Sequence, residues 1–338
     1  MSFGLPLSLA EMQAAETIQS APALELSPHT ALRSSVSFHL APFPVTSFDR
    51  CMALVLTLLV AADVLLARMV KLGSPDHLLA LFPWQEILVM GISFSVCCWR
   101  PLPRLIDTAK AFLWAGSFAS PLSFLVQTAG GSRFGLVDRQ LAWIDGCMHI
   151  NTALIHLTVA RSPFCATCSI LIYVLFVPLL SVAVILPCLF GYAYASHRFI
   201  VGVVIGVILG AALFALLPAA GPWMVESMRP SPLQATMTDY LLRLKMGYPM
   251  KAEMTHATIM SFPSEHVLVA VLGVEALSVI RAIRRPVQVL GTLICLSTVT
   301  TGWHYGIDVL GGLAVAWIAS KLARITCDRL LEMDAAKN

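Results

Sequence analysis

The sequence has little charge for its length. Only 12% of its 338 residues are Asp, Glu, Lys or Arg, whereas a soluble globular domain carries roughly 25%. Hydrophobic residues make up 58% of the chain, and its mean hydropathy is +0.80. This composition predicts an integral membrane protein. The net charge of +3, without a run of Lys and Arg, gives no reason to expect a nucleic-acid partner.

The sequence also lacks a metal-binding cysteine pattern. Its nine cysteines fall mostly inside or beside apolar runs, where a thiol behaves as a small hydrophobic group. Cys165 and Cys168 form a single C-x-x-C, which leaves a redox pair or half of a metal site as an alternative. Because no second Cys or His pair stands at zinc spacing, we expect neither a metal nor a cofactor.

The start of the sequence also has little resemblance to a signal peptide. Residues 1–45 contain no long apolar run, their first positions hold no Lys or Arg, and Glu11 and Glu16 come early. We therefore expect residues 1–45 to be a mostly disordered cytoplasmic tail, with a short amphipathic helix near residues 5–19.

What the sequence does contain is eight apolar segments close to the roughly 20 residues that a bilayer-spanning helix needs. They lie near 51–70, 82–99, 108–128, 168–193, 199–217, 264–281, 286–302 and 305–323. Runs this long and this uniformly apolar fit helices rather than barrel strands. The predicted fold class is an all-α integral membrane protein with about eight transmembrane helices, the first two forming an N-terminal part at 46–104.

Positive charges gather on one side of these predicted spans. Arg100 and Arg104 stand between spans two and three, and Arg198 stands between spans four and five. Arg281, Arg284 and Arg285 stand between spans six and seven, and Lys321, Arg324 and Arg329 stand at or after the end of span eight. The positive-inside rule makes this side cytoplasmic, together with both termini. The starts of spans six and eight then face the exoplasmic side of a bacterial inner membrane or a eukaryotic Golgi-type membrane.

Two histidines stand at those exoplasmic starts. His304 and Asp308 are four residues apart, so they share a helix face and the carboxylate can orient the imidazole. His266 follows Pro263 and Ser264, which suit a helix start whose free backbone N–H groups can hold a phosphate. This pattern indicates histidine-mediated phosphoryl transfer. The alternatives are a buried His–Asp pair that only fastens two helices, and a histidine that only caps one.

Two further stretches share the exoplasmic side. Residues 136–150 place apolar side chains at helical spacing with charged ones between them, which predicts an interfacial amphipathic helix. Residues 218–263 form a connection long enough to indicate a functional loop. Trp223 lies near its start, and its basic residues are Arg229, Arg243, Lys245, Lys251 and His256.

Taken together, the motifs resemble the type 2 phosphatidic acid phosphatase superfamily. Pro263-Ser-x-His266 and His304-x-x-x-Asp308, with the two histidines 38 residues apart, look like its last two signature motifs. The resemblance covers about residues 105–325, and it implies a six-helix phosphatase-like catalytic domain there, followed by a cytoplasmic tail at 326–338.

Within this superfamily the chain is most similar to the inositol phosphorylceramide synthases and their bacterial relatives. Residues 218–223 resemble the Pro-x-Ala-Pro-Pro-Trp element of that branch, with Gly221 in place of a proline. Residues 301–305 resemble its Thr-Gly-x-His-Tyr element, and the stretch 136–150 resembles the helix that precedes its core.

Two departures separate the chain from the phosphatases of the superfamily. Thr298 stands where they carry an Arg, and Pro222 stands where they carry a Lys before Arg229-Pro230. The synthase branch departs at both places too, so the departures favour that branch. Glu265 replaces a glycine and adds a negative charge beside the expected site. The expected catalytic residues are His266, His304 and Asp308, and the candidate substrate-binding residues are Ser264, Trp223, Tyr305, Lys251 and Arg243.

The resulting hypothesis is a membrane lipid phosphotransferase, which moves a phospho-head group such as phosphoinositol from a phospholipid to a lipid alcohol through a phosphohistidine-type intermediate. The alternative on the same scaffold is a lipid phosphate phosphatase. A third possibility is a transporter with a His/Asp proton relay. The third needs polar residues near mid-bilayer on several spans, and only Asp63 and Glu275 qualify.

Overall fold

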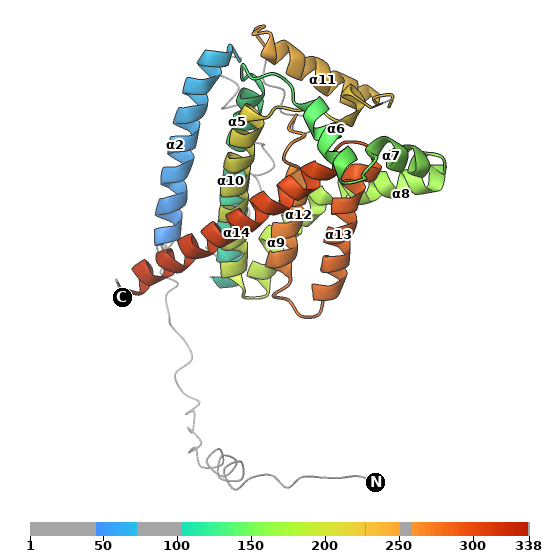
Figure 1. The fold of residues 1–338 in the computed structure, drawn as a ribbon. Helices are drawn as coiled ribbons and strands as arrows, with labels where there is room; N and C mark the ends of the chain where they lie inside the picture. Colours follow the sequence, from blue (N-terminus) through green and yellow to red (C-terminus); the bar gives the residue numbers. More distant parts are fainter. Residues whose placement is uncertain (1–44, 73–102, 227, 251–258, 337–338) are drawn as a thin grey trace, which may run out of the picture. The chain divides into compact units, whose positions relative to one another are not determined.

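The computed structural model describes residues 45–72, 103–226, 228–250 and 259–336. These ranges fall in one compact unit that begins at Pro44. Within them every regular element is a helix, apart from an isolated bridge between Leu72 and Met250. In chain order the elements are α2 (Ser47–Val70), α5 (Pro103–Gly130), α6 (Asp138–Cys147), α7 (Thr152–Ala160), α8 (Pro163–Val174), α9 (Phe176–Leu189), α10 (Ala193–Leu216), the 3₁₀ turn η1 (Pro222–Met224), α11 (Pro232–Lys245), α12 (Glu265–Leu277), α13 (Arg284–Thr300) and α14 (Gly306–Ala335) (Figure 1).

Five stretches of helix are long and apolar enough to cross a membrane, namely α2, α5, α8 together with α9, α10 and α14. They match five of the predicted spans, and they fit an integral membrane protein. α12 and α13 overlap the sixth and seventh predicted spans, but with 13 and 17 residues they are shorter. The predicted second span, 82–99, lies outside the described residues, as does nearly all of the predicted N-terminal tail. The described residues therefore support five spans of the eight predicted.

The beginning of α2 is tied to two other helices. Asp49 and Thr46 form a capping box, in which each side chain accepts a hydrogen bond from the backbone N–H of the other. The Asp49 carboxylate also pairs with Lys110 and accepts a hydrogen bond from Trp114, both on α5. The backbone N–H of Ser47 donates to Asp334 near the end of α14. These polar contacts fix one end of α2, α5 and α14 together.

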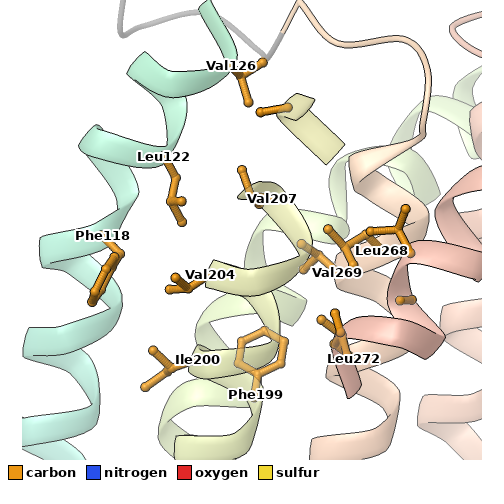
Figure 2. Close-up of a cluster of buried hydrophobic side chains, with 14 of the residues drawn as sticks. Phe118, Leu122, Val126, Phe199, Ile200, Val204, Val207, Leu268, Val269 and Leu272 are labelled. Carbon is orange, nitrogen blue, oxygen red and sulfur yellow. The ribbon is translucent and has the colours of Figure 1, made fainter. Parts of the chain in front are cut away.

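The apolar core is built around α10, which packs against α5, α9, α12 and α14. Figure 2 shows Phe118 and Leu122 of α5 across from Ile200 and Val204 of α10, while Leu268 of α12 lies on the other side of α10. These side chains are buried, and inside a bilayer their van der Waals packing holds the helices together. The core thereby holds α12, which carries the first histidine motif, at a fixed place beside α10.

A glycine lets the two histidine motifs pack directly on each other. A Cβ atom at Gly312 of α14 would lie 2.6 Å from the carbonyl oxygen of Ser264 and 2.9 Å from Cβ of Val267. Both distances are shorter than van der Waals contact. Only a residue without a side chain therefore allows α14 to lie this close to the start of α12.

The shorter helices gather where α14 begins. Figure 1 shows α6 and α7 near the first turn of α14, and α11 at the same end of the long helices. α6 packs against both α14 and η1, and α7 packs against α13. The predicted amphipathic helix at 136–150 is confirmed as α6. The helices α7 and α11 were not predicted from the sequence.

Candidate active site

The His304 ring is held through one of its nitrogens. Its Nδ1 atom lies 2.9 Å from the carbonyl oxygen of Ser261 and 3.4 Å from Oδ2 of Asp308. A carbonyl oxygen can only accept a hydrogen bond, so Nδ1 must carry the hydrogen and donate it. The unprotonated Nε2 atom is then available as a nucleophile or base.

Asp308 makes its shorter contacts to groups other than the histidine. Its Oδ2 atom accepts hydrogen bonds of 2.9 Å from the Ser261 hydroxyl and from the backbone N–H of Tyr305. The side chain is completely buried at the first turn of α14. The sequence led us to expect that Asp308 orients His304 directly. The structure shows that it also fixes Ser261, whose carbonyl oxygen is the nearer partner of the ring.

His266 lies in an aromatic enclosure. Its ring stacks on Tyr173 with centroids 4.2 Å apart, and the Phe176 ring lies 4.3 Å away on a tilted plane. The centroids of the His266 and His304 rings are 6.0 Å apart. The rings are too far apart for a direct hydrogen bond, and the gap between them is one that a phosphoryl group can bridge. The structure thus brings together the two histidines that the sequence motifs predicted.

Ser264 occupies the N-cap position of α12, as the sequence predicted, but it does not cap the helix with its side chain. Its backbone N–H donates to the carbonyl oxygen of Asp308, at 3.1 Å. Its hydroxyl oxygen is buried and has no hydrogen-bond partner among the described residues. A buried hydroxyl in this position, next to the free backbone N–H groups of a first helical turn, is suited to an anionic ligand.

A pocket lies over the two histidines. It is lined by residues of α8, α11, the first turn of α12, the segment before α12 and the turn before α14, among them Tyr173, Thr238, Ser261, His266, Trp303 and His304. It contains about 420 Å³ of empty space, part of which is open to solvent. The pocket therefore gives a ligand access to both histidine rings.

Sequence reasoning missed a clamp formed by Asp138 at the start of α6. Its carboxylate accepts hydrogen bonds from the backbone N–H of Ala220, at 3.1 Å, and from that of Gly221, at 2.8 Å. The Tyr305 hydroxyl lies 3.4 Å from the same carboxylate and 3.1 Å from the Gly221 carbonyl oxygen. Burial raises the pKa of Asp138. The amphipathic interpretation of residues 136–150 placed this carboxylate among polar surface groups, but only 3% of the residue is exposed.

Gly221 stands where the synthase element that residues 218–223 resemble has a proline, and its backbone conformation shows why proline would not fit here. Its φ angle is +144°, far from the value near −65° that a proline ring imposes. Proline would also remove the N–H group that Asp138 binds. Glycine at this position therefore allows the hydrogen bond between the Gly221 N–H group and Asp138.

Asp145 near the end of α6 forms a second clamp that sequence reasoning missed. Its carboxylate accepts hydrogen bonds of 2.7 Å from the backbone N–H of Gly306 and 2.8 Å from that of Ile307, both in the first turn of α14. The Thr152 hydroxyl donates to it as well, at 3.2 Å. Only 1% of Asp145 is exposed. A carboxylate here accepts hydrogen bonds from N–H groups that have no partner within the helix. Its negative charge is also favourable at the positive end of the helix dipole, so Asp145 holds the start of the helix that carries Asp308. The sequence signal that could have revealed the two clamps is the spacing of seven residues between Asp138 and Asp145 in an otherwise apolar pattern.

The candidate cations are placed differently from one another. Arg243 is exposed on α11 and pairs with Asp239, at 2.7 Å. Lys245 donates to the carbonyl oxygens of Ser132 and Phe134. Lys251 lies outside the described residues. Among the described residues that line the histidine pocket there is no Lys or Arg.

Three other positions singled out in the sequence are buried and support the site. The carbonyl oxygen of Thr298, which replaces the phosphatase Arg, accepts the backbone N–H groups of Trp303 and His304. Trp223 donates its indole N–H to Thr238, at 2.9 Å, and meets Trp303 edge to face at 5.6 Å. Tyr305 is fully buried against α6, and burial raises the pKa of its hydroxyl.

A family model described as the PAP2 superfamily matches residues 139–322. No curated protein and no solved structure gives a significant match. The matched range contains α6 from its second residue, the aromatic enclosure, both histidine motifs and residues 306–322 of α14. Within the described part of the chain, no cluster of three or more His, Cys, Asp or Glu side chains is arranged to hold a metal ion.

Proposed function

Because the chain belongs to the PAP2 (type 2 phosphatidic acid phosphatase) superfamily, we propose that it is a membrane lipid phosphotransferase of the inositol phosphorylceramide synthase-like kind. Membership fits either a lipid phosphatase or a lipid phosphotransferase. In the proposed reaction a phospho-head group, such as phosphoinositol, passes from a phospholipid to a lipid alcohol. The observation that carries the proposal is the Nδ1 contact between His304 and the Ser261 carbonyl oxygen, which makes Nε2 the nucleophilic nitrogen.

In the first step Nε2 of His304 attacks phosphorus. A P–N bond forms, the P–O bond to the departing lipid alcohol breaks, and His266 gives that alcohol oxygen its proton. In the second step His266 takes the hydroxyl proton of the acceptor. The acceptor oxygen attacks phosphorus, the P–N bond breaks, and His304 returns to its starting state. The 6.0 Å separation of the two rings supports this division of roles.

Several groups serve the phosphate and the ring in this proposal. Ser264 and the first backbone N–H groups of α12 hold phosphate oxygens. Asp308 keeps the His304 ring in position, both through Ser261 and through its own contact of 3.4 Å with the ring. It also stabilises the positive charge that develops on the ring. Candidate cations for the phosphate are Arg243 and Lys251, of which Arg243 would have to leave Asp239 to reach it.

A lipid phosphatase is the second candidate, with water in place of the acceptor. The departures at Thr298 and Pro222 favour the transferase, since the phosphatases use cations at those two places. The transporter alternative is less well supported. Glu275, one of its two candidate relay groups, pairs with Arg198 and accepts a hydrogen bond from Ser320, away from the histidines.

We also propose that the active site faces the exoplasmic side and that both termini are cytoplasmic. Support comes from the basic residues Arg281, Arg284 and Arg285, which stand at the opposite end of α12 and α13 from the histidines.

The test uses purified protein in detergent, with head-group-labelled phosphatidylinositol and a lipid alcohol. In His304→Asn the amide can still donate to the Ser261 carbonyl oxygen, but the nucleophilic nitrogen is gone. Turnover should fall by at least about 10²-fold. The matched control is His149→Asn, because His149 is exposed and its φ of +57° is tolerated by Asn. Full activity in His304→Asn would refute the mechanism, and release of the phosphorylated head group without an acceptor would identify a hydrolase.

A further inference from the structure

A second, larger cavity lies between α5, α9, α10 and α12, apart from the histidine pocket. It has about 820 Å³ of empty space, part of which is open to the surroundings. Of the fourteen described residues that line it, all but Ser123 and Glu265 are apolar. Seven of the side chains that Figure 2 labels belong to this lining, namely Phe118, Leu122, Phe199, Ile200, Val204, Val207 and Val269.

The cavity is elongated along the helices. Its lining runs from Phe199 to Val207 on α10 and from Ala115 to Ser123 on α5. Eight residues of rise correspond to about 12 Å on each helix. On α12 its lining residues are Glu265 and Val269, in the first two turns, at the end that carries His266. The cavity thus leads from the level of the histidines into the apolar part of the helical packing.

The first turn of α12 lies between this cavity and the active site. His266 lines the histidine pocket, whereas Glu265, its neighbour in the chain, lines the apolar cavity. Consecutive helical residues point about 100° apart, so the first turn of α12 forms the partition between the two spaces. The Oε2 atom of Glu265 is buried. A buried carboxylate accepts hydrogen bonds and repels a phosphate, so this cavity does not suit the phosphate-bearing donor.

We infer that this cavity binds the hydrocarbon chain of the acceptor, a neutral lipid alcohol with at least two polar hydrogens in its head group, and that Glu265 accepts one of them. The inference rests on the proposed transfer, in which one hydroxyl must give its proton to His266. Glu265 therefore holds a second donor. A monoacylglycerol has such a donor, whereas a diacylglycerol, with a single hydroxyl, does not.

The first experiment maps the cavity by photo-crosslinking in His304→Asn protein, which needs no turnover. The probe is a monoacylglycerol with a diazirine in its acyl chain. Crosslinks should fall on α5 and α10, and Ala119→Phe, which fills the cavity, should reduce them at least about five-fold, the amount expected from blocking an apolar site. Ala109→Phe is the matched control, because Ala109 lies on α5 but not in the lining. Crosslinks elsewhere, or equal labelling of both variants, would overturn the inference.

The second experiment compares acceptors in Glu265→Met, which keeps a similar length and removes both acceptor oxygens. With monoacylglycerol, kcat/KM should fall about ten-fold or more, the effect of losing a hydrogen bond to a charged group. With diacylglycerol it should stay within about two-fold, since no donor is lost. Equal losses with both acceptors would assign Glu265 a purely structural role at the start of α12.

The two experiments separate the inference from the proposed function. Mapped crosslinks without any transfer would leave the cavity established and the transferase refuted. Transfer with crosslinks outside α5 and α10 would refute the cavity alone. If Ala119→Phe does not fold, Ala119→Leu gives the same comparison with a smaller side chain.

Discussion

Replacing Asp145 by Asn tests whether α6 positions the catalytic helix. The carboxylate accepts the backbone N–H groups of Gly306 and Ile307 at 2.7 and 2.8 Å. An amide offers one acceptor oxygen, so its NH₂ group would face the second N–H. One charge-assisted hydrogen bond is worth roughly 1.5–3 kcal/mol, and the lost charge at the helix N-terminus adds about 0.3–1 kcal/mol. We expect Asp145→Asn to lower stability by about 2–4 kcal/mol.

Asp145→Asn should have a larger effect on lipid turnover than on the stability of the fold. A shift of about 1 Å in a catalytic group can reduce turnover roughly 10²-fold, and α14 carries Asp308 in the same turn that Asp145 binds. The assays are thermal unfolding in detergent and lipid turnover at a temperature where the variant stays folded. Arg324→Gln is the control, because it removes an exposed i,i+4 pair on α14 worth only about 0.3–0.5 kcal/mol. If Asp145→Asn matched Arg324→Gln in both assays, the positioning role of α6 would be wrong.

The remaining predictions concern the packing of the two motifs and the clamp at Asp138. Gly312→Ala places a Cβ atom 2.6 Å from the Ser264 carbonyl oxygen, so it should lower both melting temperature and turnover. Gly146→Ala, with nothing within 4 Å, should leave both unchanged, and equal behaviour of the two variants would contradict the close packing. Burial raises the pKa of Asp138 above its unfolded value, so the folded state holds this proton more tightly. The contribution of Asp138 to stability should therefore be largest below about pH 4 and decline as the pH rises through the folded pKa. The difference in melting temperature between wild type and Asp138→Asn should shrink over that range, whereas a constant difference would exclude this titration.

The long helices and the histidine motifs were predictable because each depends on neighbouring residues. Apolar runs of span length gave α2, α5 and α10 nearly at their observed positions. They also gave the start of α14, but this helix continues to Ala335, through most of the predicted tail at 326–338. The short spacing from His304 to Asp308 predicted their contact, although His304 lies in the turn before α14 and not on the helix itself.

The clamps were not predictable because they join residues far apart in the chain. Asp138 and Asp145 read as polar surface groups on an amphipathic helix, and only tertiary packing shows that they bind the backbone of other segments. The same holds for the Ser261 carbonyl oxygen, since a backbone group leaves no signature in a sequence. The apolar cavity is likewise formed by four helices whose side chains look like ordinary core residues.

The two clamps set an order for biosynthesis. Asp145 is 161 residues ahead of its partner Gly306, and Asp138 is 82 residues ahead of its partner Ala220. A ribosome adds about 5–20 residues each second, so the Asp145 carboxylate waits roughly ten seconds or more for its partner. A chain that stops before α14 therefore lacks the two backbone N–H groups that Asp145 binds, and among the described residues only Thr152 then donates to its carboxylate.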